Sequence, residues 1–174
     1  MAPLIHSAAA FGDGSHPTTQ LLMQAIEHIE DFSPAFALDI GCGSGILSLA
    51  IAQRFGCSIT ACDISADSIE TTRANAAAAG QTPRIAALQA DGFNHPAIAR
   101  GAPYDLIVMN ILAEPLVRLA SGAHAHLKND GLLMISGILR HQSDAVNEAY
   151  QAAGFEAHHR LTLGDWAAFM LVKT

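Results

Sequence analysis

Short apolar runs alternate with longer amphipathic stretches along most of the chain. Each run has the length of a buried strand, a turn signal follows it, and the next stretch carries a helical pattern. Strands that alternate with helices of about 10–15 residues are typical of βαβ units with a parallel sheet. The predicted strands are Phe36–Ile40, Ser58–Asp63, Arg84–Ala90, Leu106–Met109 and Leu132–Ser136. The predicted helices are Thr18–Ile29, Gly45–Phe55, Ala66–Ala79, Pro115–Leu127 and His141–Ala153.

The last part of the chain has a different pattern. Two strand-like runs, Glu156–Leu163 and Ala167–Val172, are separated by a short turn that contains Gly164 and Asp165. So short a connection predicts an antiparallel hairpin, which closes one edge of the sheet. The whole pattern predicts an α/β fold that resembles the Rossmann-like class I methyltransferases. Such a fold has a mostly parallel seven-stranded sheet, a C-terminal antiparallel hairpin and helices on both faces.

Composition places this fold in one globular domain, residues 1–174. The chain is 51% hydrophobic and has a net charge of -7 without any run of Lys or Arg, so we expect a cationic substrate and no direct nucleic-acid binding. Three cysteines do not make a disulfide framework. With no long apolar segment and no signal peptide, we expect a cytoplasmic protein that does not enter membranes.

A glycine-rich loop follows the first predicted strand and is the main functional signal. Glycines stand at positions 41, 43 and 45, and a helix starts directly behind them. A dinucleotide fingerprint requires its third glycine at position 46, where Ile46 stands. The loop is preceded by Asp39, a carboxylate that suits a cationic ligand better than a pyrophosphate. S-adenosylmethionine carries an ammonium and a sulfonium, so we expect Asp39, Gly41 and Gly43 to bind this methyl donor.

Two further acids follow the next strands. Asp63 comes 22 residues after Gly41, close to the spacing of about 20 residues for a carboxylate that reaches ribose hydroxyls. Asp91 follows the third strand, where it can meet the adenine amine, with Phe93 or Ile64 beside the ring. Each acid alone could be a turn or N-cap residue. Their place at strand ends behind a glycine loop makes a cofactor site the better interpretation.

Two flanking segments narrow the class of methyltransferase. The upstream segment reads Phe-Gly-Asp-Gly-Ser-His-Pro-Thr-Thr and begins at Phe11, and Asn-Ile-Leu-Ala follows the fourth strand and begins at Asn110. With Asp-Ile-Gly-Cys-Gly-Ser-Gly-Ile-Leu and Ser-Gly-Ile-Leu, these segments closely resemble the PrmA family from Phe11 onward. Enzymes of that family methylate amino groups of the eleventh protein of the large ribosomal subunit.

The resemblance implies roles for individual residues. Thr19, Gly41, Asp63 and Asn110 would contact the cofactor, and Phe11 and His16 would lie in the loop that covers its methyl and methionine end. For His16 an ordinary role in capping the helix start is an equal alternative. We expect His124, His126, His158 and His159 at the surface or in turns, and no metal site, because His-x-His supplies only two ligands.

This chain departs from the family pattern in three respects. Asp13 stands where the family usually has Thr, and Glu114 where it usually has Gly, so each adds an acid near the expected substrate mouth. We also expect that the family's separate N-terminal substrate-recognition domain is absent, because ten residues precede Phe11. Residues 1–30 would then form a cofactor-covering loop and helix, and residues 35–174 the Rossmann-like core. The chain is either an excised catalytic domain or a short homologue with another substrate.

The expected reaction is methyl transfer to an aliphatic amine, a lysine or an N-terminal amino group of a basic protein, with S-adenosylhomocysteine as product. Asn110 is the catalytic candidate, because its side-chain oxygen, or the Ile111 carbonyl, could hold the neutral amine. Amide and adenine methyltransferases have a proline and an aromatic ring here, and Asn-Ile-Leu-Ala offers neither. The alternatives are a stand-alone small-molecule methyltransferase, a non-catalytic cofactor-binding domain and, least favoured, a dinucleotide oxidoreductase.

Overall fold

The computed structural model describes residues 14–174, in which strands and helices alternate as the sequence predicts. The strands are β1 (Phe36–Ile40), β2 (Ser58–Asp63), β3 (Ile85–Gln89), β4 (Tyr104–Asn110), β5 (Leu127–Leu139), β6 (Phe155–Leu163) and β7 (Trp166–Lys173). The helices are α1 (Pro17–His28), α2 (Ile46–Phe55), α3 (Ala66–Ala78), α4 (Pro96–Gly101), α5 (Ala113–His126), α6 (Ser143–Ala152) and the short 3-10 helix η1 (Arg140–Gln142).

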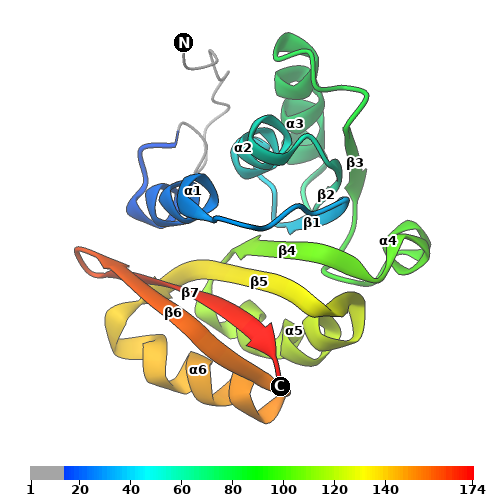
Figure 1. Cartoon of the computed structure of the whole chain (residues 1–174). Coiled ribbons are helices and arrows are strands. Elements are labelled where there is room, and N and C mark those ends of the chain that lie inside the picture. Colours follow the sequence, from blue (N-terminus) through cyan, green and yellow to red (C-terminus); the bar gives the residue numbers. More distant parts are fainter. Residues whose placement is uncertain (1–13) are drawn as a thin grey trace.

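All seven strands belong to one sheet. Their order is β3-β2-β1-β4-β5-β7-β6, and neighbours are parallel from β3 to β5. β7 is inserted antiparallel between β5 and β6, so the C-terminal hairpin closes one edge of the sheet (Figure 1). The predicted Rossmann-like methyltransferase fold is therefore confirmed.

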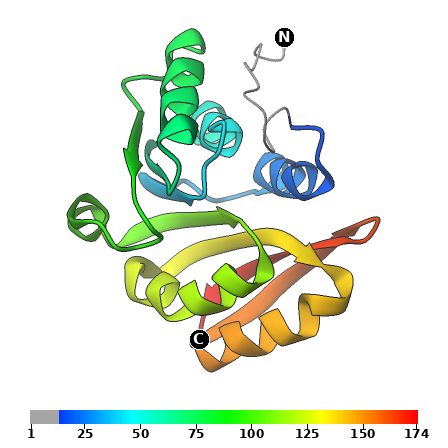
Figure 2. The same ribbon diagram turned by 180° about the vertical axis from the view of Figure 1, so that it is seen from behind.

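Helices cover both faces of the sheet, with α1, α2 and α3 on one side and α5 and α6 on the other (Figures 1 and 2). Strand residues alternate between two cores: in β4, Val108 packs with the first group of helices, and Ile107 and Met109 pack with the second. Ile98 of α4 joins the second core. No helix within residues 14–174 is long and apolar enough to cross a membrane.

The clearest differences from the sequence prediction concern β5 and α4, and the predicted helix His141–Ala153 is divided into η1 and α6. The predicted strand Leu132–Ser136 is only the middle of β5. Leu127 already pairs with Tyr104 of β4, ahead of a register shift, and the far end of β5 still pairs with β7 at Ile138 and Leu139. The short helix α4 was not predicted, because six residues are too few to show a helical period. Its start is marked locally by Pro96 in the first turn and by His95, whose ring accepts the Ala97 N–H at 3.1 Å.

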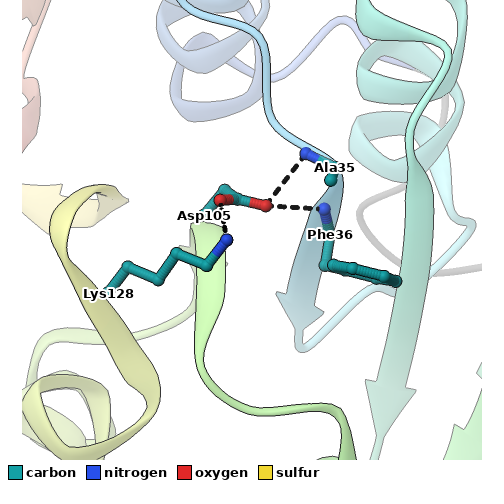
Figure 3. A network of polar contacts seen from close by, with 4 residues as sticks. All are labelled: Ala35, Phe36, Asp105 and Lys128. Carbon is teal, nitrogen blue, oxygen red and sulfur yellow. Dashed lines mark hydrogen bonds and ion pairs between the residues drawn. The ribbon is translucent and has the colours of Figure 1, made fainter.

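A polar cluster holds together the first residues of three strands, at the edge opposite to their carboxyl ends (Figure 3). One carboxylate oxygen of Asp105 accepts the backbone N–H groups of Ala35 at 2.9 Å and Phe36 at 2.8 Å. The other oxygen is paired with the ammonium group of Lys128. Burial alone would raise the pKa of Asp105, but these hydrogen bonds outweigh it, so the pKa lies below its usual value.

We expect Asp105→Asn to lower the free energy of unfolding by about 1–3 kcal/mol at pH 7, because a carboxamide cannot satisfy both amides and the ammonium group. A lowered pKa stabilises the fold above the unfolded value of about 3.9 and loses this effect as the pH falls through the folded value. The difference in the free energy of unfolding between variant and wild type should therefore become smaller below about pH 4. Urea denaturation at pH values from 7 to 3 measures it, and a constant difference would contradict the assignment.

Candidate functional site

A large cavity lies at the carboxyl ends of the parallel strands, where ligands of open α/β sheets bind. Its volume is about 780 Å³, within the range of about 300–1,000 Å³ that is typical of small-molecule sites. It collects residues that follow four different strands. From the predicted set, the residues that line it are His16, Thr19, Gly41, Gly43, Asp63, Asp91 and Asn110.

The glycine loop between β1 and α2 forms the floor of this cavity. Gly41, Gly43 and Gly45 all have positive φ, between 55° and 79°, a backbone region that side chains disfavour. The Gly41 N–H donates to the carbonyl of Cys62 at 2.8 Å, which ties the loop to the end of β2. A Cβ on Gly43 would meet no atom within 4 Å, so the loop leaves open space above this residue. A ligand can therefore approach the main chain closely there.

Side chains of helix α3 form hydrogen bonds with the same loop. The Thr72 hydroxyl donates to the carbonyl of Gly43 at 3.0 Å, and the Asn75 carboxamide donates to the carbonyl of Ser44 at 2.8 Å. A Cβ on Gly45 would lie 2.9 Å from the Thr72 methyl group, so only glycine fits without a shift. Thr72 and Asn75 are both buried, which fixes the loop before any ligand arrives.

Asp63 ends β2 with its carboxylate next to the loop. The carboxylate accepts the Gly43 N–H at 3.0 Å through one oxygen and the Ser65 N–H at 2.9 Å through the other. A carboxylate has about four acceptor positions, so two remain for ligand hydroxyls. The structure thus orients Asp63 by backbone hydrogen bonds and leaves acceptor capacity for a ligand in the cavity.

Asp91 and Ile64 lie on the cavity wall beyond Asp63. Asp91 is exposed, and the Ile64 side chain, also in the lining, is 70% exposed. Phe93, the other aromatic or apolar candidate for this wall, does not line the cavity. Its ring stacks on His126 with 4.7 Å between centroids and packs over Gly122. Of the two residues proposed beside an adenine, the structure therefore brings only Ile64 to the cavity.

Asn110 ends β4 and connects the cavity to α1. Its carboxamide nitrogen donates to the hydroxyl of Thr19 at 3.2 Å, so the carboxamide oxygen is left as the acceptor toward a ligand. Thr19 is buried in the first turn of α1. Residues 91 positions apart in the chain therefore meet in one hydrogen bond.

The turn after Asn110 is held by two glycines. A Cβ on Gly137, which has φ +89°, would lie 2.1 Å from the Ile111 carbonyl oxygen, and a Cβ on Gly41 would lie 2.3 Å from the Ile111 side chain. The backbone of Ile111 can thus pack directly against β5 only because position 137 carries no side chain. These contacts fix the position of Asn110.

The position of His16 is compatible with both roles that the sequence left open. Its ring caps α1 by accepting the Thr18 N–H at 3.4 Å, and it also lines the cavity. The His16 ring contacts Trp166 edge to face, with 4.9 Å between centroids. Trp166 lines the cavity as well and was not predicted, because it comes from the start of β7 at the far end of the chain. Phe11 and Asp13 lie outside the described residues.

Asp39 does not line the cavity. It is 1% exposed beneath the glycine loop, and it accepts the Ser48 hydroxyl of α2 at 2.6 Å. Burial raises the pKa of Asp39 to about 6, against the lowering effect of the Ser48 hydrogen bonds. The expectation of a direct contact with the ligand is therefore not supported by this geometry. Asp39 can act on a ligand in the cavity through its charge.

The remaining candidates lie outside the cavity. Glu114 is exposed on α5 and pairs with Arg118 at 3.3 Å; Arg118, which was not predicted, lines the cavity rim. His124 and His126 are half-buried, not surface residues, and the His124 ring packs against Phe155 at 5.5 Å. His158 and His159 are exposed, as expected. Within residues 14–174 no group of three or more His, Cys, Asp or Glu side chains could hold a metal ion.

Comparisons with known proteins give consistent matches. A family model described as ribosomal protein L11 methyltransferase (PrmA) matches residues 4–174. The ribosomal protein L11 methyltransferase of Brucella abortus (strain S19) is 40% identical over 168 residues, which cover 96% of this chain and 59% of that protein. Its namesake in Bradyrhizobium diazoefficiens is 35% identical over 170 residues, or 97% of this chain and 58% of that protein.

A solved structure agrees with these matches. The crystal structure of a ribosomal protein L11 methylase from Lactobacillus delbrueckii subsp. bulgaricus has a TM-score of 0.82 and 32% sequence identity, and the match covers 90% of this chain and 78% of that chain. The chain spans about three fifths of the length of the curated relatives it matches.

Proposed function

Because this chain belongs to the ribosomal protein L11 methyltransferase (PrmA) family, we propose that it is an S-adenosylmethionine-dependent N-methyltransferase. Its acceptor is an aliphatic amine of a basic protein, a lysine or an N-terminal amino group, and ribosomal protein L11 is the first candidate. The observation that carries this proposal is the meeting of Gly43, Asp63 and Asn110 in one cavity at the carboxyl edge of the sheet. Ribosomal proteins are made in the cytoplasm, and we place the reaction there.

The residues of the cavity fit the proposed cofactor. Gly43 leaves room above its backbone for the methionine part, and Asp63 keeps acceptor capacity for the two ribose hydroxyls. Ile64 provides an apolar wall for the adenine, and Asp91 an acceptor for its amino group. Asp63 beside the glycine loop and Asp39 beneath it place carboxylates next to the position of a pyrophosphate. The charge of the site thus favours a cationic nucleoside over a dinucleotide.

The protein contributes mainly by alignment. The bound cofactor supplies a methyl group on a sulfonium, whose transfer needs an amine nitrogen in line with the sulfur–carbon bond. Asn110 is positioned by Thr19 on one side and by the Ile111–Gly137 contact on the other, so its carboxamide oxygen can accept an N–H of the amine. Holding two reactants in this way can contribute roughly 7–11 kcal/mol to lowering the barrier.

The acceptor must lose a proton before it can react. Lysine titrates at about 10.4 and an N-terminal amine at about 7.7–8.0 in model peptides. Entry into a partly apolar cavity beside a cation disfavours the charged form and lowers both values. The Asn110 oxygen then accepts one of the two N–H groups of the neutral amine, and the nitrogen lone pair is left for the methyl group. No carboxylate is needed in direct contact with the nitrogen.

The proposal is tested by two measurements on this chain. Calorimetry with S-adenosylmethionine, S-adenosylhomocysteine and NADH should detect binding of the first two only. Transfer of tritiated methyl groups to purified, unmethylated ribosomal protein L11, followed by mass spectrometry, identifies the acceptor. Binding of NADH alone, or methylation of small amines without any protein product, would contradict the proposal.

We expect Asn110→Ala to lower turnover about 100-fold or more, while the affinity for S-adenosylhomocysteine changes less than tenfold. The variant removes the hydrogen-bond acceptor for the amine, so the nucleophile is no longer held in line. A misplacement of about 1 Å can already lower the rate about 100-fold. Single-turnover methyl transfer and calorimetry measure the two effects separately. Asn129→Ala, at an exposed position of β5 outside the cavity, serves as the matched control. Unchanged turnover in Asn110→Ala would refute the assignment.

A further inference from the structure

Leu112 occupies an unusual position at the mouth of the cavity. It stands two residues after Asn110, lines the cavity and is 67% exposed. It is also the N-cap residue of α5, with φ -61° and ψ 154°, and its side chain makes no capping hydrogen bond. A large apolar side chain is thus held in water at the point where a helix begins.

The start of α5 would be more stable with a different N-cap residue than Leu112. Ser, Thr, Asp and Asn are the preferred N-cap residues, because their side chains accept the unpaired N–H groups of the first turn. In α1, α3 and α4 the cap residues His16, Ser65 and His95 do so. Leu112 offers no acceptor and exposes apolar surface in addition. Departures from local rules without a gain in stability are expected at functional sites.

We propose that Leu112 is the contact for the aliphatic part of the acceptor, and that the occupant is a lysine side chain of a basic protein segment. This inference rests on the proposed function. Asn110, on the inner side, would hold the nitrogen, and Leu112 packs against the methylene groups that connect the nitrogen to the substrate backbone. An N-terminal amine has no such methylene chain and gains nothing from this contact.

The charge around Leu112 suits this occupant. Glu114, two residues further along the chain, has an 85% exposed side chain, and the protein has a net charge of -7. Arg118 balances Glu114 through one contact at 3.3 Å, but the exposed carboxylate keeps acceptor positions for basic residues next to the target lysine. An apolar contact for the stem, with an exposed carboxylate two residues further along the chain, fits a lysine side chain of a basic segment.

The test compares wild type with Leu112→Ser and Val117→Ser. Val117 lies on the same helix and is 42% exposed, but it does not line the cavity, so it controls for loss of an exposed apolar side chain. Leu112→Ser introduces a favoured N-cap, so we expect a higher melting temperature than in wild type. The affinity for S-adenosylhomocysteine should stay the same in all three proteins.

Methylamine, propylamine and pentylamine are then titrated into each protein saturated with S-adenosylhomocysteine. The chain contains a single tryptophan, Trp166, which lines the cavity and provides a fluorescence signal, with calorimetry as the second readout. In wild type and Val117→Ser, the affinity for the amine should rise about two- to fourfold for each methylene group added to its chain. In Leu112→Ser the dependence on chain length should disappear. With ribosomal protein L11 as acceptor, KM should rise about tenfold in Leu112→Ser.

Chain-length dependence that persists in Leu112→Ser would overturn the inference, as would a loss of affinity for S-adenosylhomocysteine, because Leu112 would then be a cofactor contact. The outcome for the proposed function is separate. If amine binding depends on Leu112 but no methyl group is transferred to any amine, the acceptor contact stands and the methyltransferase proposal fails. If methyl transfer occurs with an unchanged KM in Leu112→Ser, only the inference fails.

Discussion

Gly137→Ala should strongly reduce methyl transfer while the chain still folds. The new methyl group would lie 2.1 Å from the Ile111 carbonyl oxygen and 2.7 Å from its carbonyl carbon, both of which are backbone atoms that cannot rotate away. The Ile111 turn must therefore move, and Asn110 moves with it. We expect turnover to fall at least about 100-fold and the free energy of unfolding to fall by about 2–4 kcal/mol. Single-turnover kinetics and urea denaturation measure these two effects.

Gly56→Ala is the matched control for this prediction. Gly56 also has a positive φ, +67°, but a Cβ there would meet no atom within 4 Å, and the residue ends α2 away from the cavity. This variant should lose only about 1–2 kcal/mol for the left-handed backbone and keep its turnover. Equal losses in the two variants would show that backbone strain, and not the position of Asn110, explains the effect of Gly137→Ala.

The parts of the site that follow parallel strands were accessible from the sequence. Gly41, Asp63 and Asn110 each follow a buried apolar run, and the carboxyl ends of parallel strands meet at the same edge of a sheet. A correct assignment of strands therefore predicts their proximity without any knowledge of side-chain packing. The structure brings these residues to one cavity, as expected.

Contacts that depend on non-local pairing were not accessible. Trp166 reaches the cavity because β7 is inserted antiparallel between β5 and β6, and no local pattern specifies that insertion. Phe93 turns toward His126 and not toward the cavity, which depends on the packing of α5 in three dimensions.

The burial of Asp39, in contrast, could have been predicted from the sequence. Alternation along β1 places Asp39 on the same face as Ala37, under α2.

The burial of Asp39 leads to the second prediction, in which stability and ligand binding change in opposite directions. The pKa of Asp39 is raised to about 6 by burial, from about 3.9 in an unfolded chain. As the pH rises from about 4 to about 6, the unfolded chain releases this proton first, so the folded state loses stability. Above about pH 6 the loss is complete and on the order of 3 kcal/mol. Asp39→Asn removes the ionisation and should raise the free energy of unfolding at pH 7.5.

The same substitution should weaken binding of the cationic cofactor. The Asp39 charge favours a sulfonium in the cavity above it, so Asp39→Asn should lower the affinity for S-adenosylmethionine about tenfold and that for the uncharged sulfur of S-adenosylhomocysteine less. Urea denaturation from pH 4 to pH 8, without ligand, and calorimetry with both compounds measure the two effects. Ser48→Ala removes a hydrogen bond that lowers the pKa of Asp39, so it should destabilise the protein at pH 7.5. A variant Asp39→Asn with the pH dependence of wild type would show that Asp39 does not titrate in this range.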